Sequence, residues 1–259
     1  MLILLPPSEG KSVPRRGKPL DLGALSHPGL TPTRERVLDA LVGLCADDPD
    51  RAAEVLGLGP TQLDDVRRDA TLREAPTTRA DALYTGVLYD HLDLAGLDAA
   101  ARRRATRQVA VTSSLFGLVR PGDRLPSYRL AGGVRLPGLG PVAALWRPVL
   151  GEAVLEAAGR GLLVDLRSST YAAFWRPTPD LAPRVATVRV LHEQDGRRSV
   201  VSHFNKATKG RLVAALLTAG ASPGTPAQLA DALLDLGWHV ETDAPTAAST
   251  RLDVVVREV

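Results

Sequence analysis

The sequence predicts an α+β fold in which helices surround a mixed β-sheet. Short apolar segments with strand character alternate with helical segments, a pattern that favours parallel strands joined by helical crossovers. Residues 184–192 and 198–204 are joined through Asp195-Gly196, which is typical of an antiparallel hairpin. Parallel and antiparallel pairing together make the sheet mixed. With 259 residues and no evident linker, the chain is expected to form one domain over residues 1–259.

The first half of the chain begins with a strand and is otherwise mainly helical. Residues 2–5 form a short apolar strand, and the stretch 6–30, rich in Pro and Gly, is expected to be irregular. Thr31-Pro32 fits an N-cap followed by proline at the first helical position, which predicts a helix over about 33–45. Further elements are expected as a helix at about 50–56, two helices within 80–106, and a buried strand at 108–111.

The second half supplies most of the remaining strands. Pro141 starts a helix that is expected to run to Ala158, where Gly159 ends it. Thr225-Pro226 caps another helix, which is expected to end at about Leu236. The other predicted elements are a strand at 162–166, the hairpin strands named above, a helix at about 207–219, and closing strands at 238–242 and 251–258.

The segment of about 31–75 contains a pattern like a helix–hairpin–helix insertion. Gly57-Leu58-Gly59-Pro60 lies between two helical segments. In such a motif the glycines Gly57 and Gly59 let backbone N–H groups approach a DNA phosphate, and Arg67 and Arg68 add positive charge nearby. Binding of this kind is independent of DNA sequence and weakens with salt. The alternative is an ordinary pair of helices joined by a glycine turn, which the acidic Asp64-Asp65 pair favours.

Lysine is rare in this chain, and its positions guide the search for chemistry. Only 4 of the 32 basic residues are lysine, at Lys11, Lys18, Lys206 and Lys209. Arginine can replace lysine where a solvated positive charge suffices, but not where a compact ammonium or a reactive amine is needed. Lys206 also follows Asn205, the one asparagine in the chain. We therefore expect chemistry around Lys11 and Lys206, with codon usage as the alternative explanation.

Arginines and hydroxyl groups follow several predicted strands. Ligands in α/β sheets bind at the carboxyl ends of strands, and arginine binds phosphate or carboxylate in a bidentate manner. Arg120 and Arg129, with Tyr128 beside the second, are expected to grip one ligand between them. We predict an anion-binding site with Lys206, Lys11 and Tyr128 as candidate catalytic groups. The predicted ligand-binding residues are Lys11, Arg120, Arg129, Ser168, Tyr171, Asn205, Lys206 and Lys209. The alternatives are surface arginines and an internal pair between Asp165 and an arginine.

Several other classes of site are not expected. Gly10-Lys11-Ser12 follows a strand, as in a phosphate-binding P-loop, but Leu5 occupies the position of the first glycine. The single Cys45 excludes an intrachain disulfide. The 5 histidines lack metal-ligand spacing, so neither a metal nor a cofactor is expected. No apolar run is long enough to span a membrane, and the apolar N-terminus is too short for a signal peptide, so a cytoplasmic protein is expected.

Five stretches carry a resemblance to a known family. They are residues 1–11, Tyr84-Thr85-Gly86, 115–121 together with 126–130, Ser168-Ser169-Thr170-Tyr171, and 206–211. Together they resemble the YaaA family, the peroxide stress proteins of bacteria, over almost the whole chain. The resemblance implies a cytoplasmic protein linked to survival of hydrogen peroxide, an α+β fold around one mixed sheet, and DNA binding through a helix–hairpin–helix. It implies a process rather than a defined reaction.

Two hypotheses from different classes therefore remain. The first is a stress protein that binds DNA without sequence preference. The second is an enzyme or sensor for a small ligand that carries phosphate or carboxylate. They differ in whether the candidate residues converge in one pocket or spread over an open basic face. The residues that decide this are Lys11, Arg120, Tyr128, Arg129, Lys206 and Lys209.

Overall fold

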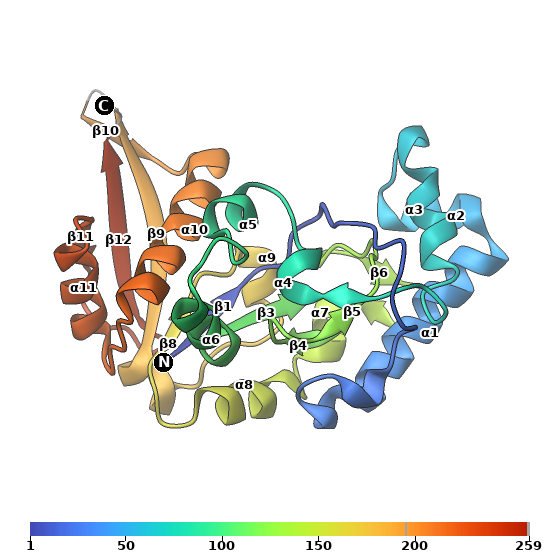
Figure 1. Cartoon of the computed structure of the whole chain (residues 1–259), viewed down its shortest axis with the longest axis horizontal. Coiled ribbons are helices and arrows are strands. Elements are labelled where there is room, and N and C mark those ends of the chain that lie inside the picture. The colour runs from blue at the N-terminus through green and yellow to red at the C-terminus, as the bar shows by residue number, and fades with distance from the viewer. Residues whose placement is uncertain (195, 258–259) are drawn as a thin grey trace.

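The computed structural model describes residues 1–194 and 196–257, and an eight-stranded mixed sheet runs through this part of the chain (Figure 1). The strand order is β11-β12-β9-β8-β1-β3-β4, with β10 paired to β9. The strands are β1 (Leu2–Leu5), β3 (Val109–Ser113), β4 (Gly117–Val119), β8 (Leu163–Asp165), β9 (Val185–Gln194), β10 (Arg197–Ser199), β11 (His239–Thr242) and β12 (Thr250–Arg257).

The five central strands β3, β1, β8, β9 and β12 are parallel to their neighbours, whereas β4, β10 and β11 pair antiparallel. The predicted α+β fold with a mixed sheet is confirmed. The predicted pairing of β9 with β10 is also present, although Asp195 lies outside the described residues. Because β1, β3 and β8 are parallel, their carboxyl ends lie at one side of the sheet, which we call the carboxyl edge.

Helices cover both faces of the sheet (Figure 1). The α-helices of the described residues, including α2 and α3 at one end of the molecule, are α1 (Thr31–Asp47), α2 (Pro49–Leu56), α3 (Leu63–Asp69), α4 (Ala80–Leu83), α5 (Val87–Leu92), α6 (Ala99–Gln108), α7 (Val142–Trp146), α8 (Leu150–Ala158), α9 (Ser169–Ala172), α10 (Ser202–Ala219) and α11 (Pro226–Asp235). Two small ribbons pair β2 (Thr78–Arg79) with β5 (Arg124–Leu125), and β6 (Arg135–Leu136) with β7 (Gly140–Pro141). All four residues of β1 are fully buried, as expected for a strand covered on both faces.

Two predicted helical segments are divided in the structure. The single helix expected over 141–158 is split into α7 and α8, because Pro148 lacks an N–H and its ring clashes with the preceding turn. The segment 80–106 holds three helices instead of two. They are separated at Gly86, where φ is 91°, and at Asp93, where φ is 42°. These left-handed conformations cannot continue a right-handed helix.

The strand expected over 198–204 is wrong beyond Ser199. The chain turns into α10 at Ser202, and the Asn205 N–H donates to the Val201 carbonyl at 2.8 Å. The helical course brings Leu212, Val213 and Leu216 into the core, a spacing that fits a helix and not a strand. The predicted helix at 207–219 is therefore present but begins five residues earlier, at Ser202.

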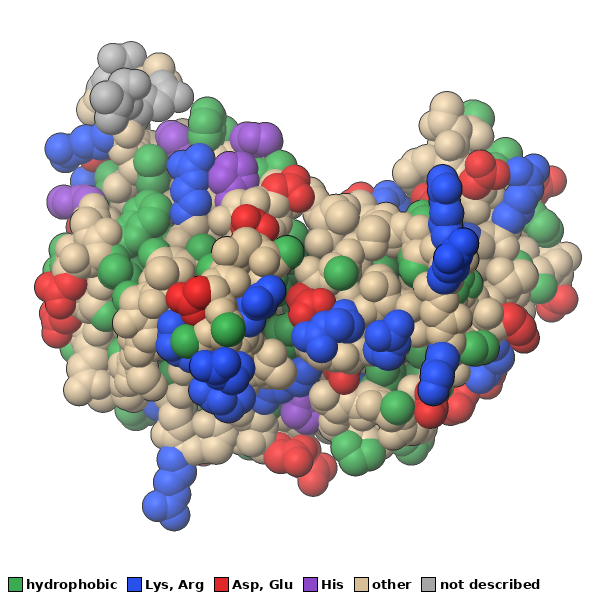
Figure 2. Space-filling view, viewed as in Figure 1, with side chains coloured by type: hydrophobic (Ala, Val, Ile, Leu, Met, Phe, Trp, Pro, Cys, Tyr) green, Lys and Arg blue, Asp and Glu red, His purple; other side chains and the backbone are tan. Residues whose placement is uncertain are grey.

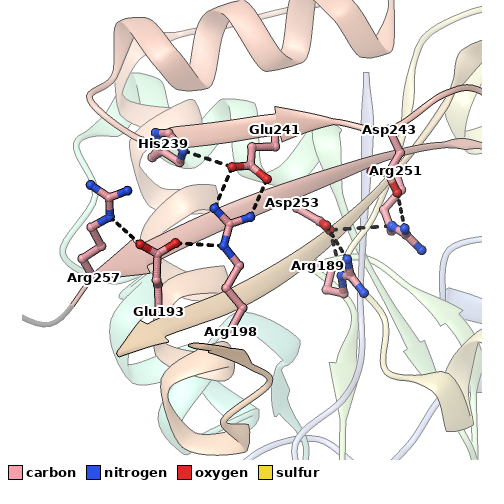
Figure 3. A network of polar contacts seen from close by, with 9 residues as sticks. All are labelled: Arg189, Glu193, Arg198, His239, Glu241, Asp243, Arg251, Asp253 and Arg257. Atoms are coloured by element: carbon pink, nitrogen blue, oxygen red, sulfur yellow. Dashed lines mark hydrogen bonds and ion pairs between the residues drawn. The ribbon is translucent and has the colours of Figure 1, made fainter. Parts of the chain in front are cut away.

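The outer face of β9, β11 and β12 carries a set of surface ion pairs that we call the charge ladder (Figure 3). Its members are Arg189, Glu193, Arg198, His239, Glu241, Asp243, Arg251, Asp253 and Arg257. Strand register places opposite charges side by side, as with Asp253 opposite Arg189 and Arg257 opposite Glu193. The alternate residues Leu252 and Val254 point to the other face and join the hydrophobic core.

Within the described residues, no helix is both long and apolar enough to cross a bilayer.

Candidate functional site

A pocket of about 550 Å³ opens at the carboxyl edge of the sheet. Four segments and one side chain form it. They are the loop 6–10 after β1, residues 85–89 at the start of α5, the loop 131–133, residues 168 and 170–171 after β8, and Lys206 of α10. Most of the lining is apolar, and the lining residues that carry a hydroxyl group are Ser8, Thr85, Tyr89, Ser168, Thr170 and Tyr171. Among the described residues that line it, Lys206 carries the only positive charge and Glu9 the only negative one.

Sheet topology explains why these segments meet. Strands β1 and β8 are parallel neighbours, with Leu4 opposite Asp165, so the chain leaves both strands at the same edge. Helix α10 packs against α5 and brings Lys206 to this edge. Gly210 permits the close approach, because a Cβ there would lie 2.2 Å from the Leu88 carbonyl oxygen. A substitution at Gly210 would therefore push α10, and with it Lys206, away from the pocket.

Three of the predicted ligand-binding residues are brought together in the lining: Ser168, Tyr171 and Lys206. The Tyr171 hydroxyl accepts a hydrogen bond from the Gly132 N–H at 3.2 Å, which joins two walls of the pocket. Lys206 is exposed and has no hydrogen bond or ion pair to the part of the chain that the structure describes. Its ammonium is therefore available to a ligand. It lies one turn inside α10, and not at a junction between strand and helix as the sequence suggested.

Lys11 lies behind the wall of the pocket rather than in its lining. Its Nζ donates to the Ser8 carbonyl at 2.7 Å and sits 4.2 Å from the centre of the Tyr128 ring. Burial, and to a smaller extent the nearby Arg129, lowers the pKa of Lys11 from 10.5 to about 7. The sequence marked Lys11 as chemically important, but its position beneath residues 8–10 depends on the fold.

Tyr128 is also buried behind the pocket. Its hydroxyl forms hydrogen bonds with Ser113 Oγ at 2.7 Å and with the Tyr84 hydroxyl at 3.1 Å. Burial raises the pKa of Tyr128 well above its ordinary value, so the phenol stays protonated at neutral pH. Tyr84 and Tyr89 stack in the same region, and the Tyr89 hydroxyl donates to the Pro6 carbonyl at 2.7 Å. Tyr84-Thr85-Gly86 was visible in the sequence as a family motif, but nothing there assigned it to a site.

Asp69 is a member of this region that sequence reasoning missed. Its side chain is fully buried, and both carboxylate oxygens accept the Arg129 N–H, at 3.0 and 3.2 Å. Burial raises the pKa of Asp69 from 3.8 to about 8. No sequence signal could have found it, because Asp69 ends α3, far from the strands that form the carboxyl edge.

The predicted grip of Arg120 and Arg129 on one ligand is wrong. The Arg129 guanidinium lies beyond the end of β1, where it pairs with the Glu9 carboxylate at 2.9 Å. Arg120 follows β4, which runs antiparallel to β3 and so ends at the opposite side of the sheet. There its guanidinium donates to the carbonyls of Arg107 and Val109, at 3.0 and 3.2 Å, at the start of β3. The two arginines are close in sequence, and the sequence did not show that β4 runs antiparallel to β3.

The remaining candidates around β8 and α10 also have structural partners. Lys209 is buried, its Nζ donates to the Leu166 carbonyl at 3.0 Å, and burial lowers its pKa to about 8. Asp165 binds the buried Arg167 in a bidentate manner, at 2.7 and 2.9 Å, which is the internal pair left open by the sequence. Asn205 is half-buried in the first turn of α10 and is not part of the pocket lining.

The α2–α3 segment projects from the other end of the molecule, and Figure 2 shows a hollow between it and the α10 end. In the turn, the Gly57 N–H donates to the Glu54 carbonyl at 3.1 Å, and the Gly59 N–H to Gln62 Oε1 at 3.3 Å. Arg67 pairs with Asp64 at 2.7 Å, and Arg68 pairs with Asp65 at 2.6 Å. The groups proposed to contact DNA are thus engaged within the chain, and the DNA-binding assignment stays a prediction.

In the described part of the chain, no cluster of three or more His, Cys, Asp or Glu side chains is arranged to hold a metal ion.

The fold and the pocket define an α+β protein with a ligand-sized cavity at the carboxyl ends of parallel strands. The family model described as peroxide stress protein YaaA matches residues 1–244. The chain is 55% identical over 261 residues to a UPF0246 protein of Streptomyces coelicolor, covering 100% of both. It is 42% identical over 244 residues to a UPF0246 protein of Corynebacterium efficiens, covering 93% of this chain and 95% of the relative. The chain belongs to the family of the peroxide stress protein YaaA.

Proposed function

We propose that this member of the peroxide-stress family binds a small anionic ligand in the pocket at the carboxyl edge. The observation that carries the proposal is the exposed ammonium of Lys206, which shares the lining with the hydroxyl groups of Ser168 and Tyr171. A lysine binds phosphate or carboxylate as a point charge, and the hydroxyl groups can donate to the remaining oxygens. A volume of about 550 Å³ suits a small molecule. A cytoplasmic site of action is part of this proposal.

Gly133 offers a way to close the pocket without disturbing the fold. It lies in the lining, and a Cβ at this position would meet no atom within 4 Å. Its backbone does not adopt the left-handed conformation that favours glycine. Neither packing nor backbone conformation therefore requires glycine here, and a larger side chain would enter the open space that the ligand needs.

Binding measurements test this proposal directly. We would titrate inorganic phosphate, pyrophosphate, citrate and AMP into the protein by isothermal titration calorimetry. Lys206→Ala and Gly133→Val should each weaken binding of the best probe by about tenfold or more, since each removes a contact or fills the site. Lys18→Ala and Gly29→Val are matched controls, because both residues are exposed outside the pocket. Equal affinity in wild type, Lys206→Ala and Gly133→Val would overturn the proposal.

The same variants test whether the pocket is needed for survival of hydrogen peroxide. In a host lacking its own family member, survival of hydrogen peroxide should fall with Lys206→Ala and stay normal with Lys18→Ala. Lys206→Arg separates two roles, because a guanidinium keeps the charge but cannot replace a compact amine. Full rescue by Lys206→Arg would leave only a general requirement for positive charge at this position.

The thiol of Cys45 is not part of the proposed response to peroxide. Cys45 is buried, and burial raises the pKa of its thiol to about 12. Peroxide reacts with thiolates, so a buried neutral thiol reacts slowly. We expect Cys45→Ala to support the same peroxide survival as wild type in the complementation assay. A loss of protection at unchanged protein level would show that the thiol takes part.

DNA binding through the turn between α2 and α3 is the second candidate function. One observation favours it: a Cβ built at Gly59 meets no atom within 4 Å, and φ at Gly59 is –81°, so the fold does not require glycine there. An open glycine lets a DNA backbone approach closely. Against it, Arg67 and Arg68 are neutralised by acidic neighbours, and Figure 2 shows acidic and basic side chains interspersed over this projection.

Electrophoretic shift assays test the DNA candidate. Gly59→Val should weaken binding to a random duplex, while Gly29→Val, another open glycine outside the turn, should not. Binding should also fall steeply with salt if phosphates are contacted. Unchanged affinity in Gly59→Val and in Arg67→Ala would remove this segment as the DNA-binding surface.

A further inference from the structure

Three of the four lysines in this arginine-rich chain surround the pocket. Lys206 lines it, whereas the half-buried Lys11 and the buried Lys209 lie behind two of its walls. The fourth, Lys18, is exposed elsewhere. Neither Lys11 nor Lys209 has a carboxylate partner within ion-pair distance among the described residues. Burying a charge without a partner is costly, so each must make contacts that an apolar residue could not.

Lys11 holds the wall that follows β1. Its Nζ donates to the carbonyl of Ser8, a lining residue, at 2.7 Å. The same ammonium lies over the ring of Tyr128, at 4.2 Å from the centroid, in a cation–π contact. The backbone on either side is tied to the α4–α5 connection: Ser12 N–H donates to the Leu83 carbonyl at 2.8 Å, and Thr85 N–H donates to the Gly10 carbonyl at 3.3 Å. Lys11 thus ties the Ser8 backbone, which lies beyond the end of β1, to the rest of this wall.

Lys209 holds the wall that follows β8 in the same way. It reaches from α10 to donate to the Leu166 carbonyl at 3.0 Å, two residues before the lining residue Ser168. The Leu166 N–H donates to the Leu4 carbonyl at 3.0 Å, so both backbone groups of Leu166 are held. Because Lys206 is one turn away on the same helix, Lys209 also sets the distance between that helix and this wall.

We propose that Lys11 and Lys209 are positioning residues of the pocket, each holding one of its two strand-following walls through a backbone carbonyl. The inference rests on the proposed function, because it concerns how the walls are held for a ligand. A compact ammonium can reach an enclosed backbone carbonyl, as at Ser8 and Leu166, in a space too small for the larger planar guanidinium. This accounts for lysine at these two positions in a chain that uses arginine almost everywhere else.

Protonation should control both contacts. Burial lowers the pKa of Lys11 to about 7 and that of Lys209 to about 8. Arg129 also lowers the pKa of Lys11, whereas Asp69, Glu9 and Asp65 raise it. The charged group that faces Lys209 is Asp165, which raises the pKa of Lys209. As pH rises through these values, the ammonium loses its charge. The cation–π contact and the charge-assisted hydrogen bond then weaken, and the walls loosen.

Amide hydrogen exchange on the ligand-free protein tests the proposal. Lys11→Met should speed exchange at Ser12 and Thr85 by about tenfold and leave Leu166 unchanged, since one local hydrogen bond is lost. Lys209→Met should do the reverse. Lys18→Met is the matched control. In the wild type, protection at these amides should fall as pH rises from 6 to 9, after correction for intrinsic rates, and each variant should lose its own pH dependence.

The outcomes separate positioning from a general structural role. Faster exchange throughout the protein, including β9 and β12, or no local change in either variant, overturns the proposal. Lys11→Arg and Lys209→Arg should behave like the methionine variants, and wild-type protection in both would also overturn it. In the phosphate titration, both methionine variants should lose affinity. The exchange measurement needs no ligand, so it decides this inference even where phosphate binding fails and the proposed function falls.

Discussion

Three titratable groups at the carboxyl edge and the charged groups of the charge ladder are arranged in opposite ways. Lys209 and Asp69 are buried and Lys11 is half-buried, and the described part of the chain gives none of the three an ion-pair partner. Every member of the ladder lies beside an opposite charge on the outer sheet (Figure 3), and all of them except the buried Asp253 are at least partly exposed. Exposed pairs are nearly neutral for stability, whereas buried single charges are unfavourable.

The difference makes the carboxyl edge the candidate for a chemical role. Groups with strongly shifted pKa values that lie next to a pocket are candidates for function, because burial of a charge persists only when something depends on it. The ladder has a simpler explanation. Its alternating charges keep a broad sheet face hydrated, and strand register gives each of them, including the buried Asp253, a partner of opposite charge. The comparison therefore directs experiments to the carboxyl edge and uses the ladder as the control.

The largest expected effect comes from breaking the buried pair at the carboxyl edge. The Arg167 side chain is only 1% exposed, and its guanidinium is held by Asp165. Asp165→Ala leaves that guanidinium buried without its partner, so the free energy of unfolding should fall by about 3–5 kcal/mol. Urea denaturation measures this. If the free energy of unfolding falls no more than it does for Arg198→Ala in the ladder, the two regions do not differ as described.

Asp69→Asn replaces a buried carboxyl group at the carboxyl edge with an amide that cannot lose a proton. Burial raises the pKa of Asp69 from 3.8 to about 8, so the folded protein holds a proton that the unfolded chain releases. The wild type therefore loses stability as pH rises from about 4 to about 8, and the asparagine variant lacks this loss. We expect Asp69→Asn to be more stable than wild type at pH 8, by an amount that grows as pH rises from 4 to 8, with no advantage at pH 4. A pH-independent difference would contradict the assignment.

Arg198→Ala should give the smallest effect, although Arg198 contacts both Glu193 and Glu241. The three side chains are solvated, and salt screens their attraction. We expect a change in unfolding free energy that is much smaller than for Asp165→Ala and that shrinks further in high salt. Parallel urea denaturation at low and high sodium chloride measures both. A large loss that persists in high salt would show that the ladder stabilises the fold in its own right.

Local sequence patterns were enough to place much of the candidate site. The apolar run at 2–5 and the strand ending at Asp165 were both evident, and parallel pairing puts Ser168 and Tyr171 at the same edge as residues 6–10. The scarcity of lysine pointed to the same region as the pocket, since Lys11, Lys206 and Lys209 all lie at this edge. These signals are local or compositional, so they can be recognised without knowledge of tertiary contacts.

Other expectations failed where tertiary structure decides the direction or the conformation of the chain. Arg120 was expected beside Arg129, but β4 runs back along β3 and carries Arg120 to the amino ends of the parallel strands. The segment 198–204 was expected to be a strand, but it is part of α10 from Ser202 onward, because the apolar residues that follow reach the core only with helical spacing. Alternating and helical patterns overlap in short segments, so sequence could not separate them there.

The sequence by itself determined the α+β class, most element positions, the family, and the few lysines that mark the pocket. Only the tertiary structure decided which of those lysines faces a ligand and which are buried. Lys206 and Lys209 are three residues apart on one helix, yet one lines the pocket and the other is enclosed against Leu166. The physical reason is that burial, and with it the pKa of a lysine, depends on what packs around the side chain. That packing comes from strands and helices distant in the sequence.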